Sequence, residues 1–140
     1  MSWTEEYDLD HIGIAVKSLD EGKPFYEALG IAGEMTTEVV PTEQVKVGFM
    51  TLKNGSRIEL LEPTSPESPI AKFLTKRGPG IHHICLRVTD IRQVMKKLKD
   101  KGLRVLSDEP KPGAHNCLVA FVHPASAGGV LVELSQKMGS

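Results

Sequence analysis

Two stretches of the chain alternate aliphatic residues with residues of other types, and they lie 72 positions apart. The first is Asp10–Val16 and the second is His82–Val88. An alternation with a period of two residues is typical of a β-strand that buries one of its faces. The pattern therefore predicts a strand near the start of each half of the chain.

The segments that follow these two strands keep the same spacing. Ser18 and Asp90 are residue types that begin helices, and Ser18 together with Glu21 matches a capping box. Gly30 and Gly102 are suited to the position just past a helix end. Between cap and glycine, apolar residues recur at helical spacing: Leu19, Tyr26 and Leu29 in the first half, and Ile91, Val94, Met95 and Leu98 in the second. The same order of elements occurs twice.

Each half then continues through β-prone segments to a final strand. These segments are Val45–Leu52 and Arg57–Leu61 in the first half, and Leu118–Val122 and Val130–Ser135 in the second. The stretches Glu38–Thr42 and Asp108–Asn116 contain Pro or Gly and are expected to form mobile loops at the rim. The order predicts an α+β fold of two tandem βαβββ modules, and we expect these modules to form a curved mixed sheet around a common cleft.

A chain of 140 residues is long enough for one hydrophobic core and short for two independent domains, so we expect a single domain, 1–140. The first module covers about 8–63, a linker covers 64–79, and the second module covers about 80–136. Within the linker, Ser68, Pro69 and Gly78 predict a short helix.

The composition narrows the classes of partner. A net charge of −1, from 17 basic and 18 acidic residues, argues against binding to nucleic acid or to an anionic membrane surface. No stretch approaches the roughly 20 apolar residues that span a bilayer, and no signal-peptide core is present, so a cytoplasmic protein is expected. Cys85 and Cys117 lie in apolar runs that suit reduced, packed thiols, with a bridge between them left open.

The alternation places four polar residues on one side of the predicted sheets. The aliphatic residues of the strands must face the helices, which leaves His11 and His83 on the opposite face. The final strands place Glu59 and Glu133 on that same face. A carboxylate between apolar neighbours is costly to bury unless a positive group pairs with it. A lone strand His or Glu is often structural, but the repetition predicts that His11, Glu59, His83 and Glu133 converge on one divalent metal ion.

The pattern says less about the roles of the remaining histidines and of two arginines. By parity, His82 points to the helix side, which suggests a structural role. His123 precedes a proline and is expected in a turn, whereas His115 lies in a loop, either solvated or at the mouth of the cleft. Arg57 and Arg87 share the face of the four candidate ligands, and either attract an anionic substrate or pair with acidic neighbours.

Six stretches together resemble the vicinal oxygen chelate superfamily, and within it the methylmalonyl-CoA epimerase family. They are Asp10–Val16, Ile58–Pro63, Gly80–Ile84, Asp108–Ala114, Phe121–Pro124 and Gly129–Leu134. The resemblance implies an enzyme that interconverts (R)- and (S)-methylmalonyl-CoA with one divalent metal ion. Co²⁺ is the first expectation, with Mn²⁺, Ni²⁺ and Zn²⁺ as alternatives. It also implies a homodimer.

The resemblance also implies roles for individual residues. His11, His83 and Glu133 match metal ligands of the family, with Glu59 as the fourth. Some relatives carry Gln at that fourth position and a catalytic Glu on the preceding strand, but here Val45–Phe49 contains no carboxylate. The hypothesis is therefore that Glu59 and Glu133 are the two acid/base groups, acting through an enolate.

Three other functions fit parts of the same pattern. Lactoylglutathione lyase shares the scaffold, the ligand types and the enolate chemistry, and it is the main alternative. An extradiol-type iron dioxygenase would use two histidines and one glutamate, which leaves Glu59 unexplained. An antibiotic-binding protein of this fold would need no metal and no buried ligand set.

Overall fold

The structure is a computed structural model that describes residues 5–33 and 35–139. The chain divides into two compact units. The first unit runs from His11 to His82, and the second combines the residues before His11 with those after His82. The expected single domain and its module boundaries stay a prediction. No helix among the described residues is long and apolar enough to cross a membrane.

The first unit contains a four-stranded mixed sheet in the order β2-β3-β4-β1. β1 (Asp8–Ala15) pairs in parallel with β4 (Arg57–Pro63). β4 pairs antiparallel with β3 (Val45–Thr51), which in turn pairs antiparallel with β2 (Thr36–Val40).

The second unit repeats this arrangement in the order β5-β8-β7-β6. β5 (Gly80–Arg87) pairs in parallel with β8 (Leu131–Lys137). β7 (Cys117–Val122) pairs antiparallel with β8 and with β6 (Lys111–Gly113). The predicted α+β class and the twofold βαβββ order are therefore confirmed.

The helix of the first module differs from the prediction. The single stripe from Leu19 to Leu29 is divided into α1 (Leu19–Gly22) and α2 (Pro24–Ala28). Pro24 explains the break, because proline has no amide hydrogen for an interior helical bond and favours the first turn. Leu29 lies beyond α2 and is 59% exposed, so it does not belong to a buried stripe.

The other helices follow their sequence signals. α3 (Pro69–Arg77) begins after Ser68 and is followed by Gly78, at φ +75°. α4 (Ile91–Asp100) begins after Asp90, whose side chain accepts a hydrogen bond from the Gln93 amide at 3.2 Å. Two short 3₁₀ turns, Ala114–Asn116 and Pro124–Ser126, complete the second unit.

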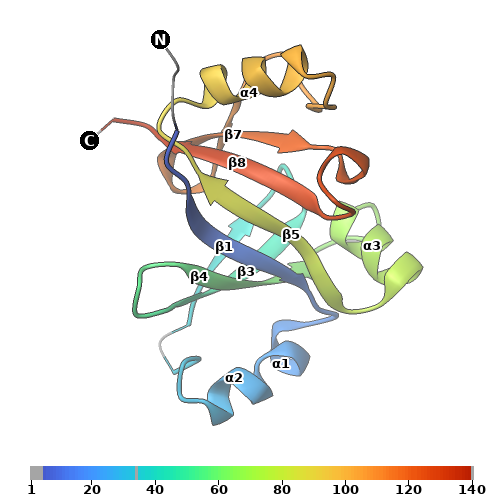
Figure 1. Cartoon of the computed structure of the whole chain (residues 1–140). Helices are drawn as coiled ribbons and strands as arrows, with labels where there is room; N and C mark the ends of the chain where they lie inside the picture. Colours follow the sequence, from blue (N-terminus) through green and yellow to red (C-terminus); the bar gives the residue numbers. More distant parts are fainter. Residues whose placement is uncertain (1–4, 34, 140) are drawn as a thin grey trace. The chain divides into compact units, whose positions relative to one another are not determined.

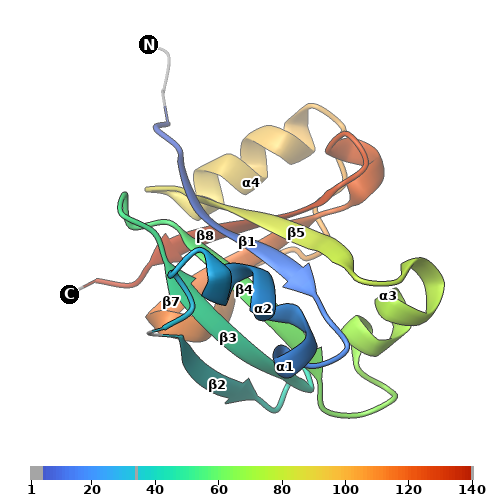
Figure 2. The ribbon, with the colours of Figure 1, turned by 90° about the horizontal axis from the view of Figure 1, so that it is seen from below.

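The helix-facing residues form the expected cores. In the second unit α4 lies across β7 and β8 (Figure 1). The core under it consists of Val88, Ile91, Val94, Met95, Ala120, Val122 and Leu134. In the first unit α1 and α2 lie over β3 and β4 (Figure 2), and the cluster between them consists of Val16, Leu19, Met50 and Leu60.

We call the opposite side of each sheet the histidine face, because it carries His11 in the first unit and His83 in the second. In the first unit part of this face is packed rather than open. Ala15, a small residue on this face, is fully buried in a cluster with Phe49, Leu61 and Ile70. α3 thus closes one end of the histidine face of the first unit.

Two segments predicted as loops contain strands. β2 overlaps the predicted loop Glu38–Thr42 at Glu38–Val40, and β6 lies within the predicted loop Asp108–Asn116. The side chains of Thr36–Glu38 are exposed on both faces of β2, so alternation of polarity could not reveal this strand. β6 has only three exposed residues, including a proline.

Candidate active site

The first unit brings together one histidine and one glutamate on its histidine face. In the β1–β4 register, His11 lies beside Arg57 and Gly13 lies beside Glu59. The His11 Nδ1 atom is 3.4 Å from the Glu59 Oε2 atom, and both side chains are 8% exposed. Two of the four predicted ligands are therefore buried neighbours.

Arg57 is the third member of this group. Its Nε donates a hydrogen bond to Glu59 Oε2 at 3.0 Å, and its terminal nitrogen is also 3.0 Å from that oxygen. The same terminal nitrogen lies 3.4 Å from His11 Nδ1. Of the two roles considered for Arg57, the pairing with an acidic neighbour is thus the one observed.

The second unit repeats the histidine–glutamate pair. His83 Nε2 is 3.3 Å from Glu133 Oε1, and the side chains are 10% and 14% exposed. In the β5–β8 register His83 lies beside Leu131 and Cys85 beside Glu133. Glu133 therefore stands two residues beyond the residue paired with the histidine, as Glu59 does in the first unit.

A phenylalanine accompanies each glutamate, a feature that our sequence reasoning missed. Phe49 on β3 is paired with Glu59, and Phe121 on β7 is paired with Glu133. Phe49 is 7% exposed and also lies under the Arg57 guanidinium, 6.0 Å from it. The two phenylalanines are 72 residues apart, so the repeat period itself was the signal that could have found them.

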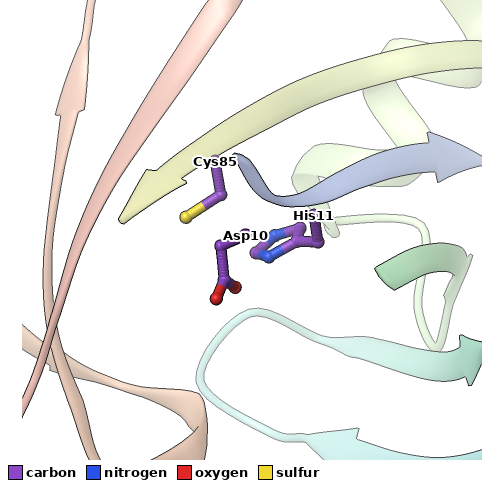
Figure 3. Close-up of side chains that lie close together, drawn as sticks. All are labelled: Asp10, His11 and Cys85. Carbon is purple, nitrogen blue, oxygen red and sulfur yellow. The ribbon is translucent and has the colours of Figure 1, made fainter. Parts of the chain in front are cut away.

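A second group of polar side chains includes Asp10 and Cys85, which both belong to the second unit. Figure 3 shows Asp10 and Cys85 of this unit with His11, the residue that follows Asp10 in β1. Asp10 Oδ1 is 3.4 Å from Arg87 Nε, so Arg87 also pairs with an acid. Cys85 is fully buried, which agrees with its predicted packing role.

The other histidines take structural or loop positions. The His82 ring makes an edge-to-face contact with Phe73, with 5.2 Å between ring centroids. His123 Nδ1 accepts a hydrogen bond from the Ala125 amide at 2.9 Å and caps the turn that follows, as expected. His115 is exposed in a 3₁₀ turn with φ +57°.

The two histidine–glutamate pairs fit a divalent cation in their chemistry. Each pair offers an imidazole nitrogen and a carboxylate oxygen, and each is largely shielded from water. Nitrogen and oxygen donors of this kind suit Co²⁺, Mn²⁺, Ni²⁺ and Zn²⁺. A cation would also offset the burial of two carboxylates, which is otherwise unfavourable.

Residues 10–121 match the model of the Glyoxalase/Bleomycin resistance protein/Dioxygenase superfamily. The chain belongs to this superfamily, and its fold is glyoxalase-like, as the resemblance implied.

Within the superfamily, the chain is similar to several methylmalonyl-CoA epimerases. The chain is 45% identical to the mitochondrial methylmalonyl-CoA epimerase of Homo sapiens, over 91% of this chain and 73% of that one. It is also 45% identical to the ethylmalonyl-CoA/methylmalonyl-CoA epimerase of Cereibacter sphaeroides, over 91% and 96% of the two chains. A Streptomyces coelicolor methylmalonyl-CoA epimerase variant, solved in complex with 2-nitronate-propionyl-CoA, superposes with a TM-score of 0.82 at 38% identity and covers 94% of this chain and 97% of its own.

Proposed function

We propose that the protein is an epimerase that interconverts (R)- and (S)-methylmalonyl-CoA by moving the proton on C2. The observation that carries the proposal is the buried histidine–glutamate pair that occurs once in each unit. The similarity of the chain to methylmalonyl-CoA epimerases supports methylmalonyl-CoA as the substrate.

The proposal includes one divalent metal ion held by His11, Glu59, His83 and Glu133. Co²⁺ is the expected ion, with Mn²⁺, Ni²⁺ and Zn²⁺ as alternatives. When bound, such an ion acts as a Lewis acid that polarises the oxygens of the thioester and carboxylate groups. A cytoplasmic homodimer is part of the same proposal, by resemblance to the family.

The two glutamates supply the proton transfers. The histidine face of β3 presents Val45, Val47 and Phe49, so no carboxylate of that strand is available. One glutamate removes the C2 proton and the electron pair moves onto the thioester oxygen, which gives an enolate. The other glutamate, in its acid form, returns a proton to C2 on the opposite side. No other co-reactant is needed.

The direct test is exchange of the C2 proton of methylmalonyl-CoA in deuterated water, followed by NMR. The apo-protein reconstituted with Co²⁺ is expected to exchange this proton with inversion of configuration, and chelator is expected to abolish both. Glu59→Gln and Glu133→Gln are each expected to slow inversion by about 10²–10⁴-fold, because each removes one proton carrier. If the wild-type protein does not exchange the C2 proton of methylmalonyl-CoA but converts the hemithioacetal of methylglyoxal and glutathione, it is the lyase instead.

A further inference from the structure

The hairpin between β3 and β4 has an asparagine followed by a glycine at its tip. The chain contains two asparagines, Asn54 and Asn116, and only Asn54 precedes a glycine. Asn54 and Gly55 are both exposed. Gly55 has φ +91°, and apart from its chain neighbours no described atom lies within 4 Å of the place that a Cβ atom would take. The tip therefore has room for a change in its main-chain path.

Ser56 donates two hydrogen bonds to the side-chain oxygen of Asn54. Its main-chain amide lies 3.1 Å from Asn54 Oδ1, and its hydroxyl lies 2.6 Å from the same atom. Ser56 is buried, so the protein holds both donors in place. Donors fixed around a carbonyl oxygen stabilise the negative charge that develops there when a nucleophile attacks the carbon. The Asn54 Cγ atom is thus activated toward attack.

We propose that Asn54 is a site of spontaneous deamidation and that Ser56 promotes the reaction. The Gly55 nitrogen gives its proton to solvent and forms a bond to Asn54 Cγ, which places the negative charge on Oδ1 beside the two Ser56 donors. The bond from Cγ to the side-chain nitrogen then breaks, and this nitrogen takes up a proton from solvent and leaves as ammonia. The product is a succinimide ring. Glycine favours its formation because no side chain shields the attacking nitrogen.

Water opens the succinimide at one of its two carbonyl carbons. Opening at Cγ gives aspartate, whose carboxylate still accepts the Ser56 hydrogen bonds. Opening at the main-chain carbonyl carbon gives isoaspartate, in which the main chain runs through the former side chain and is one carbon longer. Water is the only co-reactant, and no electrons are transferred.

Main-chain hydrogen bonds at the tip determine how often the attack occurs. The Gly55 amide donates to Leu52 O at 2.9 Å, and the Leu52 amide donates to Ser56 O at 2.8 Å. The first of these bonds has to open before the Gly55 nitrogen turns toward Cγ. Local opening of an exposed turn requires far less free energy than global unfolding, so the reaction proceeds in the folded protein.

Isoaspartate would alter the hairpin just before two residues of the candidate active site. Thr51 is paired with Arg57, and Phe49 with Glu59, across this hairpin. An additional main-chain carbon between Thr51 and Arg57 disturbs this pairing at its nearest end. The consequence for catalysis rests on the proposed function: protein rich in isoaspartate is expected to epimerise at least about threefold more slowly, because small displacements of a catalytic group lower the rate. Asn54→Asp, which keeps the normal main chain, is expected to retain the wild-type rate.

The test follows the full chain during incubation at neutral pH, with peptide mass mapping and enzymatic methylation of isoaspartate. Asn54 is expected to convert at least about tenfold faster than Asn116, the internal control, because the Cys117 side chain shields the following amide. Ser56→Ala is expected to slow conversion by about 3–10-fold, since one of two donors is lost. Ser56→Thr keeps the hydroxyl and should convert at the wild-type rate. Circular dichroism confirms that each sample is folded.

Three results would overturn parts of the inference. An Asn54 that converts no faster than Asn116 would remove the site. Faster conversion in Ser56→Ala would show that the Ser56 hydrogen bonds protect Asn54 instead. Equal epimerisation by fresh and isoaspartate-rich protein would remove the effect on the active site. Because conversion is read from mass, it is decided separately from the proposed function, which fails only if fresh protein does not epimerise methylmalonyl-CoA.

Discussion

At the scale of single residues, the surroundings of the two glutamates define what each can do. Phe49 and Phe121 stand beside Glu59 and Glu133 in the strand register. An aromatic ring beside a carboxylate excludes water from one side, so a proton taken from substrate is returned to substrate more readily than it is lost. The two glutamates therefore share an aromatic neighbour at the equivalent strand position.

The placement of these residues was only partly predictable. Alternation along the strands correctly put His11, Glu59, His83 and Glu133 on the histidine faces, because side chains two residues apart share a face. The same rule left two partners open for Arg57, since a long side chain can reach either substrate or an acid from one backbone position. In the structure Arg57 pairs with Glu59 and its guanidinium lies over the Phe49 ring, and alternation encodes neither contact.

Glu5 provides a residue-scale test of electrostatics outside the site. Burial tends to raise the pKa of the Glu5 carboxyl, but hydrogen bonds from the Thr89 hydroxyl and from the Thr89 and Asp90 amides outweigh it and lower the pKa below 4.5. Its contribution to stability is therefore complete above pH 4.5 and is lost as the pH falls through the lower, folded-state pKa.

Glu5→Gln is expected to lower the free energy of unfolding at pH 7 by about 0.5 kcal/mol or less, since the group is near the surface. Urea unfolding at pH 7 and at pH 3 measures this. The difference between wild type and variant should shrink at the lower pH. An equal difference at both pH values would mean that charge plays no part in the contact.

At the scale of the elements, α1 and α4 begin with the same arrangement of capping hydrogen bonds. Ser18 and Asp90 each accept a hydrogen bond from an amide of the first turn, as their identity predicts. In addition, the Leu19 amide donates to Glu62 Oε1 at 2.7 Å, and the Ile91 amide donates to Gln136 Oε1 at 2.8 Å. The last strand of each module thus secures the start of the helix of the same module.

Helices with strong caps and strands with a clear alternation were predicted well, whereas β2, β6 and the division between α1 and α2 were missed. Caps and terminal glycines act within one turn, so Ser68 and Gly78 marked α3 correctly. β2 and β6 are stabilised mainly by backbone pairing with β3 and β7, which leaves little trace in side-chain polarity. Pro24 was a local signal that the reading of one continuous stripe overlooked.

Ser68 tests how burial changes the strength of a helix cap. It is fully buried, and its hydroxyl accepts a hydrogen bond from the Ile70 amide at 3.1 Å. Ser68→Ala is expected to reduce the free energy of unfolding by about 1–2 kcal/mol, because the amide loses its partner away from water. Ser18→Ala, at the more exposed cap of α1, should reduce it by only about 0.5 kcal/mol. Urea denaturation of both variants gives the comparison, and equal losses would show that burial is irrelevant.

At the scale of the whole molecule, the two units resemble each other more closely in their strands than in the helices that pack on them. Both units have the same strand order and carry a histidine–glutamate pair. Their helix-side cores differ, since two short helices cover the first sheet and one longer helix, α4, covers the second. The strand positions of the histidine–glutamate pairs are thus a part of the repeat that both units share.

The central claim is that two repeated pairs serve one ion, and calorimetric titration of the apo-protein with Co²⁺ tests it most directly. We predict one Co²⁺ per chain, with affinity weakened at least about 100-fold by either His11→Ala or His83→Ala, because a ligand is removed in each case. Circular dichroism confirms that both variants are folded before titration. Two ions per chain, or wild-type affinity after loss of either histidine, would contradict a shared site.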